Sequence, residues 1–251
     1  MKIIAVIPAR YGSTRLPAKP LVMIHGKPMI QWVYENARKA KLPSQVVVAT
    51  DDDRIVKVVE AFGGVAVLTD AALNSGTDRV AAVARHPSGQ YQADIYLNIQ
   101  GDEPLMSSLA VDAAIELIVK DGFMMSTVMT PLAGLEDLDN PNVVKVLADR
   151  RKRAIYFSRH PIPYSRGERP KTADESIARR HVGLYAYTRE TLFQFSDLPP
   201  SKIEQAEILE QLRAQEAGIE IGISEVNFLS IGVDTSDDLE KVREILGSSK
   251  S

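Results

Sequence analysis

The stretch IIAVIPARYGSTRLPAKP, residues 3–20, carries the signal that decides the fold. Residues 3–7 are all apolar and mostly β-branched, a pattern typical of a strand that is buried on both faces of a parallel sheet. A loop rich in Pro, Gly, Ser, Arg and Lys follows directly, at residues 8–20. We therefore expect a buried first strand that leads straight into a cationic loop.

The same alternation of apolar strand and amphipathic helix continues along the chain. Further strands are expected at residues 46–50, 65–68, 95–99, 124–129, 143–148, 182–187 and 219–226. Helices are expected at residues 28–41, 51–62, 78–85, 109–120, 203–217 and 235–245, the last capped by Thr235 or Ser236. Strand and helix in turn indicate right-handed βαβ units. The pattern predicts an α/β fold with a Rossmann-like, mostly parallel open sheet.

The 251 residues are enough for one large domain or two small ones. We find no internal repeat and no long linker, so we expect a single domain over residues 1–246. The regular alternation loosens after residue 130, which predicts a β-containing insertion around residues 143–190 that could carry dimer contacts. Residues 247–251, GSSKS, are expected to form a disordered tail.

Composition excludes several classes of protein and site. The chain has no cysteine, so disulfides and thiolate metal sites are impossible, and four histidines make a multi-histidine zinc site a poor candidate. A net charge of −3 argues against binding nucleic acid by bulk charge. No apolar run approaches the roughly 20 residues of a membrane helix. The apolar run at residues 3–9 is short and contains Pro8, unlike a signal peptide, so we expect a cytoplasmic protein.

Ligands in open α/β sheets bind beyond the carboxyl ends of the strands, where the loop at residues 8–20 lies. Its backbone N–H groups could hold phosphates, and Arg10 and Lys19 could neutralise them. The loop has neither the GxxxxGK[ST] nor the GxGxxG spacing. The alternative is a solvated basic loop without a ligand.

Two acidic segments lie at similar positions: one follows an expected strand, and the other precedes the last expected helix. In NIQGDEP, residues 98–104, Asp102 is placed to hold Mg²⁺ on a phosphate, and Gly101 allows close backbone approach. In GVDT, residues 232–235, Asp234 could supply a second carboxylate, if it converges on Asp102. The alternatives are a simple acidic turn for Asp102 and a helix N-terminal role for Asp234.

Taken together, these motifs resemble those of sugar nucleotidyltransferases with a glycosyltransferase-A-like sheet. More closely, the chain is similar to the 3-deoxy-manno-octulosonate (Kdo) cytidylyltransferases, the CMP-Kdo synthetases of lipopolysaccharide biosynthesis. The resemblance runs almost end to end, through segments in the same order. They are IPARYGSTRLPAKPL (7–21), HGKPMIQWV (25–33), VVVATDD (46–52), NSGTDR (74–79), NIQGDEP (98–104), NPNVVKV (140–146), YFSR (156–159), RHVGLYAY (180–187), EILEQLR (207–213) and GVDT (232–235).

This resemblance implies Mg²⁺-dependent transfer of CMP from CTP to Kdo, with release of pyrophosphate, by a homodimer that binds neither nucleic acid nor membrane. It also implies roles for individual residues. Arg10 and Lys19 would contact the triphosphate, and Asp102 and Asp234 would hold Mg²⁺. The nucleotide would be surrounded by Ala9, Ser13, Ser75, Gly76, Arg79 and Gln100. The sugar would face Arg15, Gln100, Arg159, His181, Tyr185, Glu210 and Gln211.

The residues on the sugar side also have structural interpretations. A single histidine at a strand start, such as His181, is often packed, and Tyr185 could equally belong to a core. Glu204, Glu207 and Gln211 share one side of the helix expected at residues 203–217, and most such faces are solvated. The basic run at residues 150–153 is interpreted as a solvated turn.

The sequence departs from the family pattern in three places. Ala18 stands where the family usually has glycine, so a positive φ there would add strain. Gln205 replaces a frequent histidine, and residues 148–159 are more basic than usual. These last two leave open a modified Kdo, such as an 8-amino form, or another sugar acid. A non-catalytic nucleotide-binding protein of the same fold is the alternative from a different class.

Overall fold

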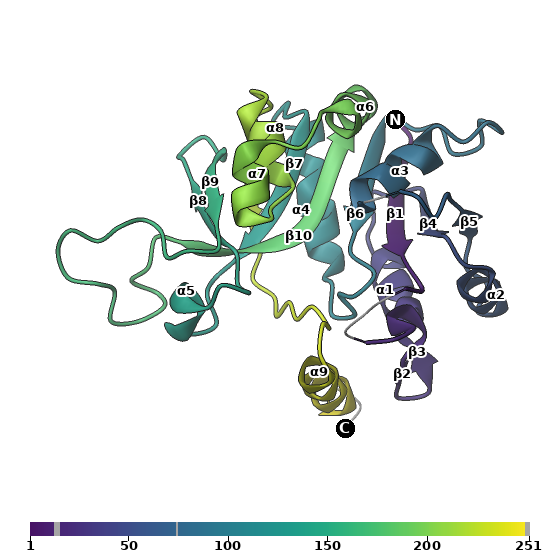
Figure 1. Cartoon of the computed structure of the whole chain (residues 1–251), viewed down its shortest axis with the longest axis horizontal. Helices are drawn as coiled ribbons and strands as arrows, with labels where there is room; N and C mark the ends of the chain where they lie inside the picture. Colours follow the sequence, from purple (N-terminus) through teal and green to yellow (C-terminus); the bar gives the residue numbers. More distant parts are fainter. Residues whose placement is uncertain (13–15, 74, 249–251) are drawn as a thin grey trace. The chain divides into compact units, whose positions relative to one another are not determined.

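The computed structural model describes residues 1–12, 16–73 and 75–248 (Figure 1). The chain divides into two compact units. The first unit contains residues 1–112 and 229–251, and the second contains residues 113–228. The insertion expected at residues 143–190 lies inside the second unit, which begins earlier and ends later in the sequence. That residues 1–246 form a single domain stays a prediction.

The first unit is built on a parallel sheet in the order β6-β1-β4-β5, as the apolar runs predicted. The strands are β1 (Ile3–Ala9), β4 (Gln45–Thr50), β5 (Ala66–Leu68) and β6 (Ile95–Ile99). In register, Val6 of β1 lies opposite Val47 on one side and Asn98 on the other. β1 is therefore central, and its residues 3–7 are at most 5% exposed.

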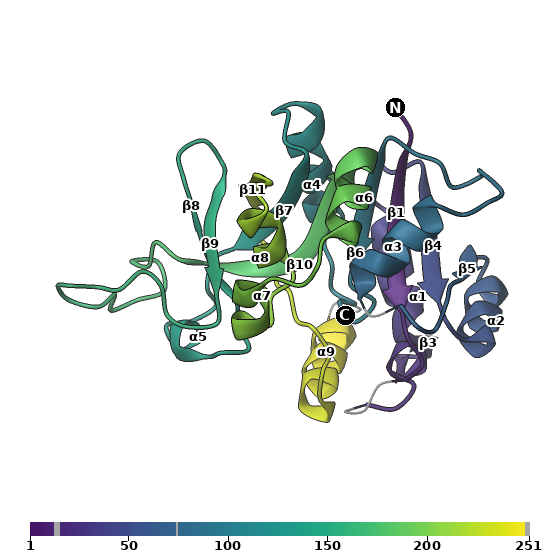
Figure 2. The same ribbon diagram turned by 45° about the horizontal axis from the view of Figure 1, so that its top comes forward.

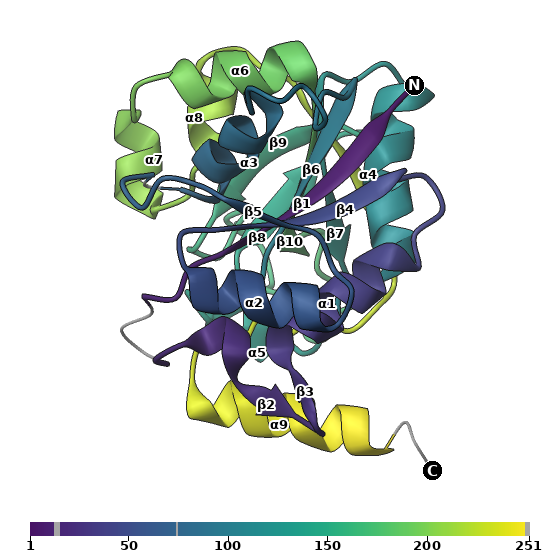
Figure 3. The same cartoon turned by 90° about the vertical axis from the view of Figure 1, so that its right-hand side faces the viewer.

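Helices cover both faces of this sheet, as Figure 3 shows. Helix α3 (Gly76–Ala84) contacts β1 and β6, whereas α1 (Met29–Arg38) and α2 (Asp53–Ala61) contact β4 or β5 from the opposite face. The chain adds β4 and β5 on one side of β1 and then returns to place β6 on the other. Right-handed crossovers require this change of face. The carboxyl ends of β1 and β6 therefore flank the topological switch point, where ligands bind in such folds.

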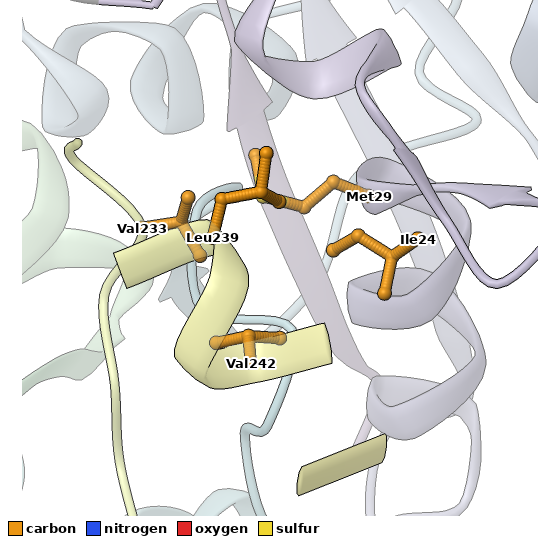
Figure 4. Packing of buried hydrophobic residues seen from close by; sticks show 5 residues of the cluster. All are labelled: Ile24, Met29, Val233, Leu239 and Val242. Carbon is orange, nitrogen blue, oxygen red and sulfur yellow. The ribbon is translucent and has the colours of Figure 1, made fainter. Parts of the chain in front are cut away.

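The last helix, α9 (Ser236–Ser248), returns to the first unit and closes its second core (Figure 4). Its Leu239 and Val242 pack with Val233 against Ile24 and Met29. These residues are at most 6% exposed, and Ile24 lies in the hairpin of β2 (Met23–Ile24) and β3 (Lys27–Pro28). Because α9 continues to Ser248, the prediction of disorder is wrong at residues 247 and 248, which are helical.

The second unit contains a mixed sheet in which β7 (Met125–Thr130) lies between β10 (Arg179–Thr188) and β11 (Ile221–Glu225). β10 is antiparallel to β7, and β11 is parallel to it. A hairpin of β8 (Lys145–Ala148) and β9 (Ala154–Ser158) joins β10. The segment between β9 and β10 extends away from these strands (Figure 2). The unit therefore has the β content that the insertion predicted.

The helix expected at residues 203–217 is the main error of the sequence interpretation. The structure has two short helices instead, α7 (Lys202–Glu207) and α8 (Gln211–Glu216). They are separated at Ile208, which has a left-handed backbone with φ 53°. The Arg159 guanidinium donates to the carbonyl oxygens of Glu207 and Ile208, at 2.7 and 3.3 Å, and so replaces helical partners there.

The other differences are mainly helices and strands that the sequence analysis did not predict. Helix α4 (Ser108–Val119) lies where the sequence predicted it. The apolar pattern gave no signal for the short helix η1 (Lys19–Leu21), for α5 (Glu136–Asp139), for β9 or for α6 (Arg189–Asp197). Helix α6 is capped by the Thr188 hydroxyl, which accepts from the backbone N–H of Thr191 at 3.3 Å. That cap signal was readable in the sequence.

Ala18 has φ 53° and ψ 33°, the left-handed conformation in which a side chain is strained. We predict that Ala18→Gly stabilises the protein. Relief of roughly 1–2 kcal/mol of strain exceeds the roughly 0.4–1 kcal/mol lost to the freer unfolded chain. Thermal unfolding should show a rise of a few degrees at most. The matched control, Ala61→Gly at the exposed end of α2, should lower the midpoint, and a lower midpoint for Ala18→Gly would contradict the prediction.

Candidate functional site

Three charged side chains from distant parts of the chain meet in the first unit. The Lys19 ammonium donates to Asp102 Oδ2 at 2.6 Å and to Asp234 Oδ1 at 3.0 Å. Lys19 begins η1, Asp102 follows β6, and Asp234 precedes α9. The two carboxylates therefore converge on one cation, the condition under which Asp234 could supply a second carboxylate beside Asp102.

Two hydrogen bonds between the acidic segments explain why the carboxylates converge. The Val233 N–H donates to the Asp102 carbonyl at 2.9 Å, and the Ser230 hydroxyl donates to Glu103 Oε2 at 2.7 Å. Thr235 caps α9, since its hydroxyl accepts from the Asp238 N–H at 3.2 Å. The capping alternative for Asp234 is therefore unnecessary, and the Asp234 carboxylate faces Lys19.

The charge state of Lys19 follows from its surroundings. Burial lowers the pKa of Lys19, but the charges of Asp102 and Asp234 and their hydrogen bonds outweigh burial, and the net pKa is raised above its ordinary value. The side chain is 15% exposed, against 30% for Asp102 and 46% for Asp234. Lys19 is thus a fixed cation at neutral pH, with the carboxylates on its solvent side.

Gly101 confirms the expected close approach of two backbones. A Cβ atom at this position would lie 2.6 Å from the Pro8 carbonyl oxygen, closer than real contacts allow. Glycine therefore lets the loop after β6 lie directly against the end of β1. This contact brings the cationic loop and Asp102 to the same edge of the sheet.

Arg79, expected near the nucleotide, is fully buried and held by other residues. Its guanidinium donates to Asp51 Oδ2 at 2.8 Å, to Thr69 Oγ1 at 2.7 Å and to the Asp70 carbonyl at 3.3 Å. Its side chain has 0% exposure. These bonds fix the segment after β5 against the loop after β4. A direct contact of Arg79 with the nucleotide stays a prediction.

The start of α3 is organised by a capping box. The Ser75 hydroxyl accepts from the Asp78 N–H at 3.1 Å, and the Asp78 carboxylate accepts from the Ser75 N–H at 3.1 Å. Gly76 lies directly over Asn98 and Pro8. The Asn98 Oδ1 atom is buried without a hydrogen-bond partner within the described residues. This places Ser75 and Gly76 beside the ends of β1 and β6.

The remaining predicted nucleotide residues lie along the same edge. Ala9 ends β1 and is 3% exposed, Arg10 is exposed next to it, and Gln100 follows β6. The charge of Arg10 contributes to lowering the pKa of Arg79, after burial and against Asp51, so the two guanidinium groups are neighbours. Ser13 and Arg15 lie outside the described residues.

The carboxylate pair is the candidate metal site. No group of three or more His, Cys, Asp or Glu side chains gathers in metal-binding geometry among residues 1–12, 16–73 and 75–248. Mg²⁺ prefers one or two carboxylates completed by phosphate oxygens and water. Asp102 and Asp234, which already share one cation, fit that requirement.

In the second unit the structure brings His181 and Tyr185 together. Their ring centroids are 5.4 Å apart, and His181 also packs edge-on against Phe157 at 4.9 Å. The His181 Nε2 atom lies 3.0 Å from the Thr127 hydroxyl. Burial raises the pKa of Tyr185 well above its ordinary value, and the charge of Glu210 adds to this, so Glu210 is near.

Gln211 is the predicted sugar-side residue with an unmet bonding requirement. It is 4% exposed, and its Nε2 atom is buried without a hydrogen-bond partner in the described part of the chain. Such a group costs about 1–3 kcal/mol unless a partner is supplied. The alternative interpretation, that this side of residues 203–217 is a solvated face, does not hold, because Glu204 pairs with Arg213 at 2.7 Å and Glu207 accepts from Ser158 at 2.7 Å.

Arg159 lines a different part of the second unit. Its guanidinium donates to carbonyl oxygens of Pro141, Glu207 and Ile208, which are neutral acceptors. With Pro141 and Glu207 it borders a cavity of about 1210 Å³. His181, Tyr185 and Gln211 do not border that cavity. Among the described residues, the Arg159 guanidinium therefore keeps a positive charge without a carboxylate in ion-pair contact.

Comparison with known proteins identifies the family. The cytidylyltransferase family model matches residues 4–221. The chain belongs to the cytidylyltransferase family. This confirms the resemblance found from the sequence and the expectation of a nucleotidyltransferase with a mostly parallel α/β sheet.

Relatives of this cytidylyltransferase match nearly the whole chain. The 3-deoxy-manno-octulosonate cytidylyltransferases of Geotalea daltonii and Geotalea uraniireducens are both 49% identical to it over 253 residues. The matches cover 98% of this chain and 98% and 99% of theirs. The solved structure of CMP:2-keto-3-deoxy-manno-octonic acid synthetase complexed with CTP matches with a TM-score of 0.90 and 44% identity, covering 99% of this chain and 100% of that one.

In each unit, sequence reasoning missed residues that hold a predicted site residue in place. Asp51 accepts a hydrogen bond from the Arg79 guanidinium, and Glu207 accepts one from the backbone N–H of Arg159. Lys145 is fully buried and binds the Arg159 carbonyl at 2.6 Å. Lys145 and Glu207 lie inside the family-like segments NPNVVKV and EILEQLR. A charged residue among apolar neighbours in such a segment was the sequence feature that could have identified them.

We predict that His181 stays neutral down to acidic pH, because burial lowers its pKa to about 3. The unfolded chain takes up this proton near pH 6.5, so stability should fall as pH drops from about 6.5 to about 3. NMR titration of the imidazole signals, assigned by their loss in His181→Gln, checks this. A titration midpoint near 6.5 would contradict the lowered pKa. His25→Gln, on an exposed turn, is the control variant: it also lacks one histidine but should keep the signals assigned to His181.

Proposed function

We propose that this cytidylyltransferase transfers CMP from CTP to 3-deoxy-D-manno-octulosonate, giving CMP-Kdo and pyrophosphate for lipopolysaccharide biosynthesis. The observation that carries the proposal is the convergence of Lys19, Asp102 and Asp234 at the carboxyl edge of the parallel sheet. The near full-length relatives named for this reaction support the choice of both substrates.

The reaction requires positioning and charge neutralisation more than a protein nucleophile. The anomeric hydroxyl of the sugar attacks the α-phosphorus, a new P–O bond forms, and the bond to pyrophosphate breaks. Lys19 and Arg10 would neutralise the triphosphate. Asp102 and Asp234 would hold Mg²⁺, which when bound withdraws charge from phosphate oxygens and favours loss of the hydroxyl proton.

The other proposed roles follow the two units. In the first unit, Ala9, Ser75, Gly76, Arg79 and Gln100, with Ser13, would surround the nucleotide. In the second unit, Glu210, His181, Tyr185 and the Gln211 Nε2 group, which has no hydrogen-bond partner among the described residues, would offer polar groups to sugar hydroxyls. The Arg159 guanidinium, bonded to neutral carbonyls, would attract the sugar carboxylate, and Arg15 and Gln100 would also face the sugar.

We also propose that the protein works as a homodimer in the cytoplasm. Exposed apolar side chains in and near the expected insertion support the dimer: Tyr164 is 92% exposed, Ile177 70% and Ile208 77%. Exposed apolar groups of this size are typical of contact surfaces when they gather in one region. Among the described residues, no helix is both long enough and apolar enough to cross a membrane.

The proposed reaction is tested by pyrophosphate release with matched substrates. CTP, UTP, ATP and GTP are each supplied with Mg²⁺ and Kdo, and CTP is then paired with Kdo, its 8-amino analogue and a sialic acid. We expect release with CTP and Kdo. Release with the 8-amino analogue but not with Kdo would change the assigned substrate and leave the proposed mechanism unchanged. No release with any acid, from folded protein, would contradict the proposal.

We predict that Asp234→Asn weakens metal binding. Removing one of two carboxylates should raise the Mg²⁺ concentration for half-maximal rate by about 10-fold or more. An electron paramagnetic resonance titration with Mn²⁺ gives a second reading that does not depend on turnover. Asp53→Asn, in the exposed first turn of α2, is the control and should leave both readings unchanged. An unaltered metal requirement in Asp234→Asn would exclude Asp234 as a ligand.

A further inference from the structure

Lys145, at the start of β8, is a fully buried lysine whose ammonium group is completely hydrogen-bonded. It donates to the carbonyl oxygens of Val143 at 2.6 Å, Arg159 at 2.6 Å and Asn140 at 2.8 Å. Its exposure is 0%. An ammonium group has three N–H donors, so these bonds use all of them. A buried charge with this geometry holds three separate backbone positions at one point.

Keeping this charge inside the protein is unfavourable by itself. Burial lowers the pKa of Lys145, the nearby Arg159 lowers it further, and Asp137, Asp139 and Glu207 oppose the change. Buried charges are often less stabilising than apolar side chains of similar volume. Lys145 is therefore a candidate for a role beyond packing, and its bonding partners indicate which one.

The partners of Lys145 connect it to the proposed sugar-side residues. Its bond to the Arg159 carbonyl fixes the backbone from which that guanidinium extends. The guanidinium in turn donates to the Pro141 carbonyl at 2.9 Å, inside the loop that Lys145 binds at Asn140 and Val143. Lys145 and Arg159 thus hold one loop from two sides.

The same network reaches the other sugar-side elements. The Val144 carbonyl, beside Lys145, accepts from the His181 N–H at 2.8 Å. The Arg159 side chain also binds the carbonyl oxygens of Glu207 and Ile208, where α7 ends and the chain turns toward Gln211. One buried ammonium group therefore supports the segments that carry Arg159, His181 and Gln211.

We propose that Lys145 is a positioning residue for the sugar-acid substrate, which sets the placement of the Arg159 guanidinium for the substrate carboxylate. This inference rests on the proposed function of the cytidylyltransferase. Lys145 itself does not touch the substrate, since its donors are all used by backbone carbonyls. Its effect is therefore on binding of the sugar acid and not on binding of CTP.

The test is a steady-state comparison of Lys145→Met with the wild type, in which the concentrations of Kdo and CTP are varied separately. Displaced groups of this kind change kinetics by about 10- to 100-fold. We expect KM for the sugar acid to rise by about 10-fold or more and KM for CTP to change less than about 2-fold. Lys202→Met, at an exposed lysine of the same unit, is the matched control and should leave both constants unchanged.

A double-mutant cycle shows whether Lys145 acts through Arg159. If it does, Lys145→Met should add little to the loss already caused by Arg159→Gln, because residues of one network are not additive. Circular dichroism shows whether Lys145→Met folds. If it does not, Lys145→Gln is used in the same comparison, because its side chain retains two N–H donors. An unchanged KM for the sugar acid, equal changes in both KM values, or additivity with Arg159→Gln would overturn the inference.

Failure of the inference is distinguishable from failure of the proposed function. Wild-type protein that turns over CTP and Kdo, with an unchanged sugar KM in the Lys145 variant, overturns only the role of Lys145. Wild-type protein that releases no pyrophosphate with any sugar acid overturns both.

Discussion

The first unit depends on one electrostatic constraint, the cation of Lys19 between the carboxylates of Asp102 and Asp234. Two carboxylates this close to a common atom repel each other unless a cation lies between them. The cluster therefore joins the loop after β1, the loop after β6 and the segment before α9. The apolar contacts of α9 with Ile24 and Met29 hold the same segment in place, so packing and charge reinforce each other.

The same arrangement connects structure to chemistry. A site for a nucleoside triphosphate must hold cations for the phosphates and carboxylates for a metal ion, although these groups attract one another. In this cytidylyltransferase Lys19, Asp102 and Asp234 form an ion cluster near the carboxyl ends of β1 and β6, at the topological switch point, and we propose that they take these roles. The backbone bond from Val233 to Asp102 keeps the two acidic segments in register.

The second unit uses its cations differently. Lys145 and Arg159 donate to backbone carbonyls, and the Glu207 carboxylate accepts from Ser158 and from the Arg159 backbone N–H. Carbonyl oxygens hold a cation without neutralising it, so the partly exposed Arg159 guanidinium keeps its charge. The first unit therefore balances its cation with carboxylates, whereas the second holds the Arg159 cation with neutral acceptors.

The sequence by itself determined the parallel strands, most helix positions and the motif segments, because apolar periodicity and turn residues act locally. It also indicated the strain at Ala18, which the left-handed φ confirms. The tertiary structure decided which distant charges meet, such as Asp234 with Lys19, and where an apparently continuous helix breaks. The amphipathic pattern of residues 203–217 runs through Ile208, but the Arg159 guanidinium, far away in sequence, takes the carbonyl oxygens at that point. Local periodicity cannot report such a competitor, since the bond exists only after β9 and α7 have been brought together.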